Sequence, residues 1–193
     1  MTFNLTPRLD RALRLASYSH DKGNHYRKGE LRIPYIMHPF AVMSMLTNVT
    51  SNEDVLIAAL LHDTLEDLNP SIISEQDIKE AFGDEVLFLI KSVSKDPAIN
   101  DWRESNEDYI RRLVDSNSTG AMLVSLGDKT HNLFSTLLDY ERIGNKVWER
   151  FSTKNKADQV WWYTKLEEVF RQHLEPSPLL EQYQGYVERL RAL

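Results

Sequence analysis

The sequence predicts an all-α protein, and three features of its 193 residues support that prediction. Apolar residues recur mainly at spacings of three and four, which is the repeat of an amphipathic helix. There are only seven Gly and seven Pro, so the chain has few residues that break helices. No convincing pair of segments has the alternating pattern of a β-hairpin. A bundle of helices therefore accounts for nearly the whole chain.

The first helix is expected to begin at Pro7, because proline in the first turn forfeits no intrahelical hydrogen bond. Leu9, Leu13 and Ala16 then form one apolar stripe, and the helix should reach about Ser19. The next segment, 21–34, has the sequence DKGNHYRKGELRIP. Its Gly and Pro content predicts a loop, and its concentration of Lys, Arg and His makes it a candidate anion-binding loop.

Capping patterns place several of the later helices. Ser51 with Asp54, and Ser74 with Asp77, have the spacing of a capping box, and Gly83 stands where a helix should end. The expected helices span 37–48, 52–67, 75–82, 84–93, 106–115, 119–143, 147–153, 157–174 and 178–191. No repeat or clear linker divides them. We therefore expect a single domain over residues 1–193, with the C-terminal helices from about 147 to 193 packed on the rest.

Composition excludes several classes of function. Lys and Arg number 23 against 29 Asp and Glu, and the net charge of −6 is spread along the chain. This argues against nucleic acid or an anionic membrane as the main partner. The absence of Cys removes disulfides and thiolate metal sites, so any metal must be held by His and carboxylates. No apolar run has the length of a signal peptide or a membrane span, so we expect a cytoplasmic protein. The sequence does not indicate an oligomeric state.

Polar residues interrupt three otherwise apolar segments. His38 lies in PYIMHP, where two prolines bracket the entrance to a helix. The apolar run VLIAALLHDTLEDL carries four titratable groups whose spacing places them on one face, namely His62, Asp63, Glu66 and Asp67. A third stripe follows the spacing i, i+3, i+4 and i+7 and consists of Asp128, His131, Asn132 and Ser135. Such a stripe should face a wet cavity, since an unpartnered polar group in a dry core costs about 1–3 kcal/mol.

Each of these features has a simpler explanation when it stands alone. A single His on an apolar helix is more often a packed or surface residue than a ligand, and a loop could cover the polar stripe. Together they favour another interpretation, because buried carboxylates repel one another unless a cation lies between them. Two His and two Asp from three separate segments therefore predict a metal site.

The order of these motifs resembles that of the HD-domain metal phosphohydrolases, and more closely the hydrolase domain of the RelA/SpoT alarmone enzymes and their small stand-alone relatives. Those proteins have a basic loop like H-x-G-Q-x-R-K-x-G-x-P-Y-I-x-H-P, an H-D-x-x-E-D helix and an L-x-D-R-x-H-N helix. The matching stretches here are HDKGNHYRKGELRIPYIMHP, HDTLED and LGDKTHN, and FGDEVLFLIKSVSK is similar to the family's FG-x-x-V segment leading to V-T-K. The likeness spans about Ala12 to Leu138 and implies an HD-domain helical bundle.

The resemblance also implies a role for each matching residue. A single divalent metal, usually Mn²⁺, would be held by His38, His62, Asp63 and Asp128. Glu66 and Asp67 match the acidic pair assigned to the hydrolytic water and to proton transfer. The implied substrate contacts are Arg27, Lys28, Tyr35, His131, Asn132 and Ser135. The implied reaction removes the 3′-diphosphate of a guanosine or adenosine alarmone, (p)ppGpp or (p)ppApp, and releases pyrophosphate.

The chain departs from the family pattern at several points. The basic loop has one extra residue before Arg27 and a longer spacer after it, so base selection stays open. Lys129 and Thr130 stand where Arg and Leu are common, and Ser135 stands where Thr is frequent. Too few residues follow the last motif to form a synthetase domain, so we expect a hydrolase without its own synthetase.

Two alternatives remain at this stage. The chain could be another HD nucleotide phosphohydrolase, such as a nucleotide phosphatase or an enzyme that removes the 2′-phosphate of NADPH. It could also be a nucleotide-binding sensor without turnover, although a sensor has no need for Glu66 and Asp67. Outside the motifs, His20 is expected either to contact the loop or the substrate, or to cap a helix or pack. His25 and His173 are expected at the surface. The aromatic run 161–163 is expected to pack in the core rather than to bind a partner.

Overall fold

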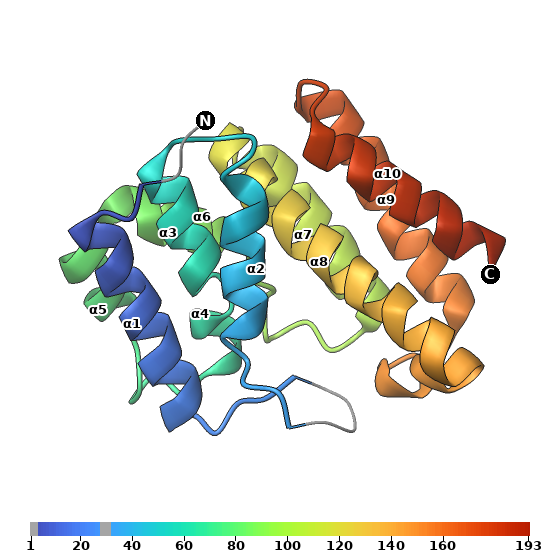
Figure 1. Ribbon diagram of the computed structural model, residues 1–193, viewed down its shortest axis with the longest axis horizontal. Coiled ribbons are helices and arrows are strands. Elements are labelled where there is room, and N and C mark those ends of the chain that lie inside the picture. Colours follow the sequence, from blue (N-terminus) through green and yellow to red (C-terminus); the bar gives the residue numbers. More distant parts are fainter. Residues whose placement is uncertain (1–3, 28–31) are drawn as a thin grey trace.

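Helices make up most of the computed structural model, which describes residues 4–27 and 32–193 (Figure 1). Within that part of the chain there is no strand, only an isolated bridge between Tyr26 and Pro34. The prediction of an all-α protein is confirmed. In chain order the helices are α1 (Pro7–Lys22), α2 (Met37–Leu46), α3 (Glu53–Leu61), α4 (Thr64–Asp67), α5 (Glu75–Phe82), α6 (Asp84–Val93), α7 (Trp102–Asp115), α8 (Thr119–Ile143), a 3-10 helix (Gly144–Arg150), α9 (Lys156–His173) and α10 (Pro178–Ala192).

The helix ends show which capping predictions hold. Ser74 and Asp77 form the expected capping box at the start of α5, and Gly83 ends that helix with a φ of 92°. The Ser51–Asp54 prediction is wrong, because the side chain of Asn52 caps α3 by accepting a hydrogen bond from the Asp54 backbone N–H. An Asn at this position caps as well as a Ser, and its own side chain reaches the exposed donor.

The helix expected over 52–67 is divided into α3 and α4, with a turn at His62 and Asp63. Side chains satisfy carbonyl oxygens at the end of α3: His62 Nδ1 lies 2.8 Å from the Ala59 carbonyl and Thr64 Oγ1 donates to the Leu61 carbonyl. These bonds replace part of the helical ladder and let the chain change direction. Two candidate metal ligands therefore lie at a break in the backbone rather than on a continuous helix.

Other boundaries differ from the sequence-based expectation. The first helix extends to Lys22, and α7 begins at Trp102 because Asp101 caps it by accepting from the Glu104 backbone N–H. The segment expected as a helix over 147–153 is a 3-10 helix, Gly144–Arg150. Short 3-10 turns commonly follow a long α-helix.

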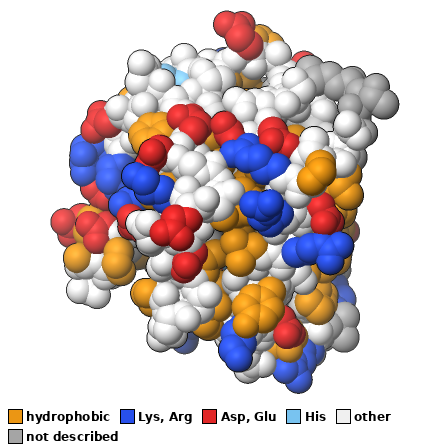
Figure 2. All heavy atoms as spheres, turned by 90° about the vertical axis from the view of Figure 1, so that its left-hand side faces the viewer, with side chains coloured by type: hydrophobic (Ala, Val, Ile, Leu, Met, Phe, Trp, Pro, Cys, Tyr) orange, Lys and Arg blue, Asp and Glu red, His pale blue; other side chains and the backbone are white. Residues whose placement is uncertain are grey.

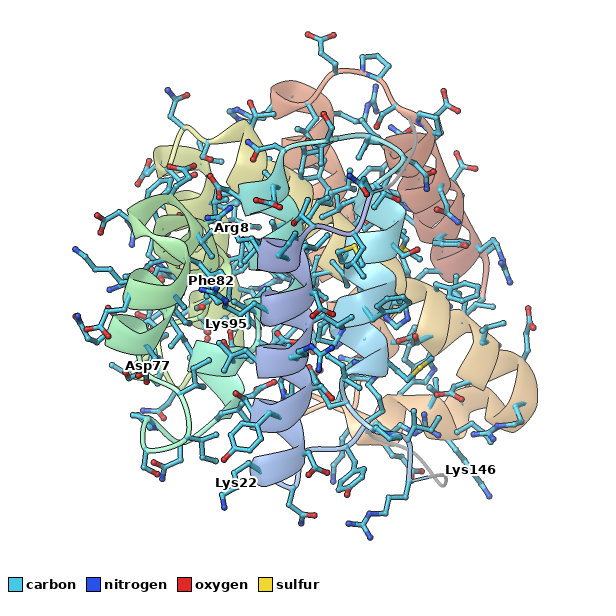
Figure 3. The ribbon with its side chains drawn as sticks, turned by 60° about the vertical axis from the view of Figure 1, so that its left-hand side comes forward. Arg8, Lys22, Asp77, Phe82, Lys95 and Lys146 are labelled. Atoms are coloured by element: carbon cyan, nitrogen blue, oxygen red, sulfur yellow. The ribbon has the colours of Figure 1, made fainter. Side chains whose placement is uncertain are left out.

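The core lies around α3, in which every side chain from Val55 to Leu61 is buried. Helices α1, α2, α6 and α8 contact it, while α9 and α10 cover the other side of α8 (Figure 1). Arg8 joins α1 to its neighbours, since it lies 2.6 Å from Asp54 Oδ1 and donates to the Phe82 carbonyl (Figure 3). The expected packing of Trp162 and Tyr163 in the core is confirmed.

The helices α2 and α8 pack closely against each other at Gly127. A Cβ atom added at Gly127 would lie 3.0 Å from Val42 Cγ1 and 3.2 Å from Leu46 Cγ, so only glycine fits there without a shift. This contact sets the separation between the helix that carries His38 and the helix that carries Asp128.

The outer surface is mixed in charge. On the face shown in Figure 2, acidic and basic side chains are interleaved, with apolar side chains between them. None of the described helices combines the length and the apolar character that a membrane crossing requires.

Candidate metal centre and adjoining cavity

Four polar side chains from three segments converge on one point in the protein. His38 Nε2 lies 3.0 Å from Asp128 Oδ1 and 3.4 Å from Asp63 Oδ2. His62 Nε2 lies 3.1 Å from Asp63 Oδ2 and 3.6 Å from Asp128 Oδ1. The donor atoms of His38, His62 and Asp128 all lie within 4.8 Å of one another, and all three residues are buried. The structure thus brings together the four residues expected to hold a metal.

The backbone positions each of these donors. His38 occupies the first turn of α2, His62 and Asp63 occupy the turn between α3 and α4, and Asp128 lies in the middle of α8. The close crossing at Gly127 brings α8 against α2. The centre therefore depends on three features of the fold. These are the break between α3 and α4, the close packing of α2 and α8 at Gly127, and the start of α2 between two prolines.

Hydrogen bonds orient both imidazoles. His62 Nδ1 lies 2.8 Å from the Ala59 carbonyl oxygen and donates to it. His38 Nδ1 lies 2.8 Å from His131 Nδ1. Both Nε2 atoms therefore face the centre, and among the described residues neither has a hydrogen-bond partner, because the carboxylate contacts are ion-pair distances without hydrogen-bonding angles. A buried ring nitrogen in this state is typical of a metal ligand whose other nitrogen is fixed by a second partner.

The electrostatics of the centre favour a cation. Burial alone would raise the pKa of Asp63, but the charge of His62 and His38 holds that pKa well below its usual range. Burial also acts against ionised Asp128, yet the Lys129 ammonium and the imidazoles hold its pKa well below the usual value. Two ionised carboxylates enclosed among buried groups require positive charge between them. A nitrogen and oxygen donor set without thiolate suits Mn²⁺, Fe²⁺ or Zn²⁺.

The acidic pair lies beside this centre and lines a cavity of about 380 Å³. Glu66 Oε2 accepts a hydrogen bond of 2.9 Å from the Lys95 backbone N–H. Burial, together with repulsion by Asp63 and Glu66, raises the pKa of Asp67 to about 7. A carboxyl group with this pKa can exchange a proton near neutral pH.

Most of the expected substrate contacts line the same cavity. Arg27 Nη2 donates to Asn132 Oδ1 at 3.1 Å, and the Tyr35 hydroxyl donates to Asp63 Oδ2 at 2.6 Å. Ser135 lies further along the same wall. Lys28 lies outside the described residues. Arg32 is exposed and bonds to Asn24 and Tyr26 in the loop, outside the set of residues that line the cavity.

The position of His131 differs from the expectation that it contacts substrate. Its ring lies against His38, with the two Nδ1 atoms 2.8 Å apart, and it is absent from the described cavity lining. Burial and the neighbouring His38 and Arg27 lower the pKa of His131 to about 4, so it is neutral and can accept the His38 N–H. His131, three residues after Asp128 on α8, thus contacts a candidate metal ligand from the side away from the cavity.

A second wall of the cavity, formed by Lys95, Lys129, Tyr109 and Trp162, is less evident from the sequence. Lys95 Nζ lies 5.4 Å from the centre of the Trp162 ring, and Lys129 Nζ lies 5.0 Å from the Tyr109 ring. Lys129 also contacts Asp128 Oδ2 at 2.6 Å. Lys95 lies among the helices in Figure 3, whereas Lys22 and Lys146 extend from the molecule. In the sequence, the only indication that these lysines belong to the site is their position at the ends of the SVSK and GDK stretches.

His25 is also part of the cavity, which corrects the expectation that it is a surface residue. Its ring stacks on Tyr35 with centroids 3.7 Å apart and planes inclined by 15°. His20 is buried, as one expectation had it, and also contacts the loop through His25. His173 is exposed, as expected.

The chain is similar to known proteins in sequence and in fold. A family model described as "HD domain" matches residues 12–155. The chain is 33% identical over 130 residues to the bifunctional (p)ppGpp synthase/hydrolase SpoT of Escherichia coli K12, a match that covers 65% of this chain and 18% of SpoT. It is 36% identical over 128 residues to the guanosine-3′,5′-bis(diphosphate) 3′-pyrophosphohydrolase of Aquifex aeolicus, covering 65% of this chain and 17% of that protein. The chain thus spans about a fifth of the length of these relatives.

A solved structure extends the comparison to the whole fold. It is described as a metazoan ortholog of SpoT that hydrolyzes ppGpp and plays a role in starvation responses. The TM-score is 0.80 at 23% sequence identity, and the match covers 100% of both chains. This likeness concerns the fold, including the helices after the last sequence motif.

Proposed function

This chain belongs to the HD-domain family, and from that premise we propose that it is a metal-dependent 3′-pyrophosphohydrolase of guanosine or adenosine alarmones. The observation that carries the proposal is the convergence of His38, His62, Asp63 and Asp128 beside the acidic pair, in a cavity with cationic side chains on both walls. The relatives named for this reaction support the choice of substrate class.

We further propose that these four residues hold one Mn²⁺ ion. The Nε2 atoms of both imidazoles are buried and have no hydrogen-bond partner in the described part of the chain, and together with the ionised carboxylates they fit a divalent cation. When bound, such an ion would acidify a water and polarise a phosphoryl oxygen. His131 and the Ala59 carbonyl would keep the two imidazoles in the tautomer that leaves Nε2 unprotonated.

The acidic pair would manage the protons of the reaction. In the proposed step, the oxygen of water bonds to the phosphorus that is attached to the ribose 3′-oxygen, and the bond between that phosphorus and the 3′-oxygen breaks. Asp67 or Glu66 takes the proton from the water, and the ribose 3′-oxygen takes up a proton as it leaves. Asp67, with a pKa of about 7, is suited to accept a proton at neutral pH. The products are a nucleoside 5′-phosphate species and pyrophosphate.

The two walls of the cavity would divide the substrate between them. Arg27, Tyr35, Asn132 and Ser135 form the wall proposed for the nucleoside, to which Lys28 is assigned from the sequence alone. Lys95 and Lys129 form the wall proposed for the terminal phosphate of the 3′-diphosphate, since two ammonium groups near one ring favour a dianion there. A 3′-diphosphate carries a second phosphate that would lie near both lysines, and we therefore propose pyrophosphate release rather than the removal of one phosphate.

Product analysis tests the proposal. The purified protein is incubated with Mn²⁺ and ppGpp, pppGpp, ppApp, NADPH or deoxynucleoside monophosphates, and the products are separated by ion exchange. We expect pyrophosphate from an alarmone, loss of that activity in Glu66→Ala and Asp67→Ala, and no change in the surface control Glu80→Ala. Release of inorganic phosphate alone would identify a phosphatase instead, and tight binding without turnover would identify a sensor.

A further inference from the structure

The rings of His20, His25 and Tyr35 contact one another, and His25 also lies beside Asp67 of the acidic pair. His20 Nδ1 lies 3.1 Å from His25 Nδ1. His25 in turn stacks on Tyr35, and its Nε2 lies 3.8 Å from Asp67 Oδ2. One ring thus connects a buried histidine of α1 to a carboxylate at the end of α4. The family motif has Gln two residues before the Arg of the basic loop, whereas this chain has His25 there.

The contacts select one tautomer of each imidazole. Only one of the two Nδ1 atoms can carry the proton that they share. If His25 Nδ1 carried it, the proton of neutral His20 would lie on Nε2, which is buried and has no hydrogen-bond partner among the described residues. Buried N–H groups without an acceptor are rare because they lose their hydrogen bond to water. The proton is therefore favoured on His20 Nδ1, which donates to His25 Nδ1.

The same choice is favoured on the side of Asp67. With the shared proton on His20, neutral His25 carries its own proton on Nε2, the atom that faces the Asp67 carboxylate. When Asp67 is ionised, above its pKa of about 7, the other tautomer would direct a lone pair at the carboxylate, which is repulsive. The contacts with His20 and with Asp67 therefore favour the same tautomer of His25. The 3.8 Å separation is longer than a hydrogen bond, and such contacts commonly shorten when substrate enters a site.

We propose that His25 is a positioning residue, which donates its Nε2–H to Asp67 and so holds that carboxylate toward the reacting water, while His20 fixes the proton on the correct nitrogen. The stack on Tyr35 fixes the plane of the His25 ring, and Tyr35 in turn donates to Asp63. His25 thus links the geometry of the acidic pair to that of the metal centre. This inference rests on the proposed function only for its effect on the rate.

The first test measures the tautomers and needs no turnover. Ring ¹⁵N chemical shifts of the protein prepared without metal identify which nitrogen of each histidine is protonated. We expect the Nδ1–H form for His20 and the Nε2–H form for His25, with His173 as an exposed reference that shows the averaged shifts of an unconstrained ring. A protonated Nδ1 on neutral His25 would overturn the proposal.

The second test separates the hydrogen bond from the ring stack. His25→Gln keeps an N–H near the position of Nε2 but loses the ring, whereas His25→Phe keeps a ring for Tyr35 but loses the donor. We expect His25→Phe to lower kcat by about tenfold or more, the usual effect of losing a hydrogen bond to a charged group, with little change in KM. His25→Gln should retain most of the kcat, and His173→Gln should match the parent protein.

The outcomes distinguish this inference from the proposed function. If His25→Phe has the parent kcat, or if His25→Gln is as impaired as His25→Phe, the donated hydrogen bond is not what His25 provides. If the parent protein releases pyrophosphate from no substrate, the proposed function fails, while the ¹⁵N shifts still decide the tautomers. Mn²⁺ titration of each variant establishes that a lower kcat does not come from a damaged metal centre.

Discussion

The close crossing of α2 and α8 gives the sharpest test of how the fold builds the site. Gly127 directly precedes Asp128, and the atoms that a Cβ would meet belong to Val42 and Leu46, both fully buried. We predict that Gly127→Ala separates the two helices slightly and weakens metal binding. Gly185 on α10 is a matched control, because nothing lies within 4 Å of a Cβ added there.

The magnitude follows from two opposing effects. Alanine is favoured over glycine in a helix by about 1 kcal/mol, so Gly185→Ala should stabilise the protein by about that amount. Gly127→Ala gains the same propensity, but its contacts of 3.0 and 3.2 Å are shorter than ordinary van der Waals distances. Overpacking of a buried site costs about 1–3 kcal/mol, so the net effect should be a destabilisation of about 1 kcal/mol. For a chain of this size, 1 kcal/mol moves Tm by about 2–4 °C.

Thermal unfolding of the metal-free protein and Mn²⁺ titration by calorimetry measure the two effects. We expect Tm to fall for Gly127→Ala and to rise for Gly185→Ala, and Mn²⁺ affinity to fall only for Gly127→Ala. If Gly127→Ala stabilises the protein as much as Gly185→Ala and binds Mn²⁺ as the parent does, the short crossing does not set the geometry of the centre.

Three further predictions concern the centre, the cavity and the fold. Asp128→Ala should weaken Mn²⁺ binding by roughly a hundredfold or more, because it removes an ionised ligand. The exposed control Asp115→Ala should leave the affinity unchanged. Equal affinities of the two variants in calorimetry would show that Asp128 is not a ligand. Lys95→Met should raise KM for a 3′-diphosphate substrate by about tenfold but not for a 3′-monophosphate, with the exposed Lys146→Met as control. Burial and the nearby Lys129 lower the pKa of Lys95 to about 8, so the ammonium loses its charge as the pH rises through 8 and the KM of the parent protein should rise there; a rise that persists in Lys95→Met would have another origin. Ser74→Ala should lower the free energy of unfolding in urea by about 1 kcal/mol without changing the rate of hydrolysis.

The sequence predicts the helices well because their signals are local. Caps such as Ser74 and the apolar stripe of α1 lie within a few residues of the structure that they determine. The break between α3 and α4 is not local in this sense. The apolar pattern continues across His62 and Asp63, so periodicity alone indicates one helix. What ends α3 is the competition of the His62 and Thr64 side chains for backbone carbonyls, which a residue pattern does not reveal.

From the sequence, the candidate site could be predicted only where charged residues interrupt apolar segments. Charged groups in apolar helices, such as Asp63 and Asp128, are conspicuous because burial is costly for them. The wall that contains Trp162 and Tyr109 carries no such signal, since an aromatic residue on a helix follows the same pattern whether it packs in a core or lines a cavity. His25 was expected at the surface for a related reason. Its partner Asp67 is distant in sequence, and its partner Tyr35 lies at the far end of the same loop, so only the folded loop brings both to it.

The distribution of charge explains how a protein with a net charge of −6 could hold a polyanion. Four acidic groups of the cavity, Asp63, Glu66, Asp67 and Asp128, lie at or beside the metal centre, where a bound divalent ion would offset Asp63 and Asp128. Arg27 and Lys95 also line the cavity, where they lie near the rings of Tyr35 and Trp162. The partial burial that lowers the pKa of Lys95 also strengthens its attraction for a phosphate, because the surrounding medium screens the charge less. Recognition in this arrangement depends on the local field inside the cavity, so neutralising a surface lysine should leave it unchanged and neutralising Lys95 should not.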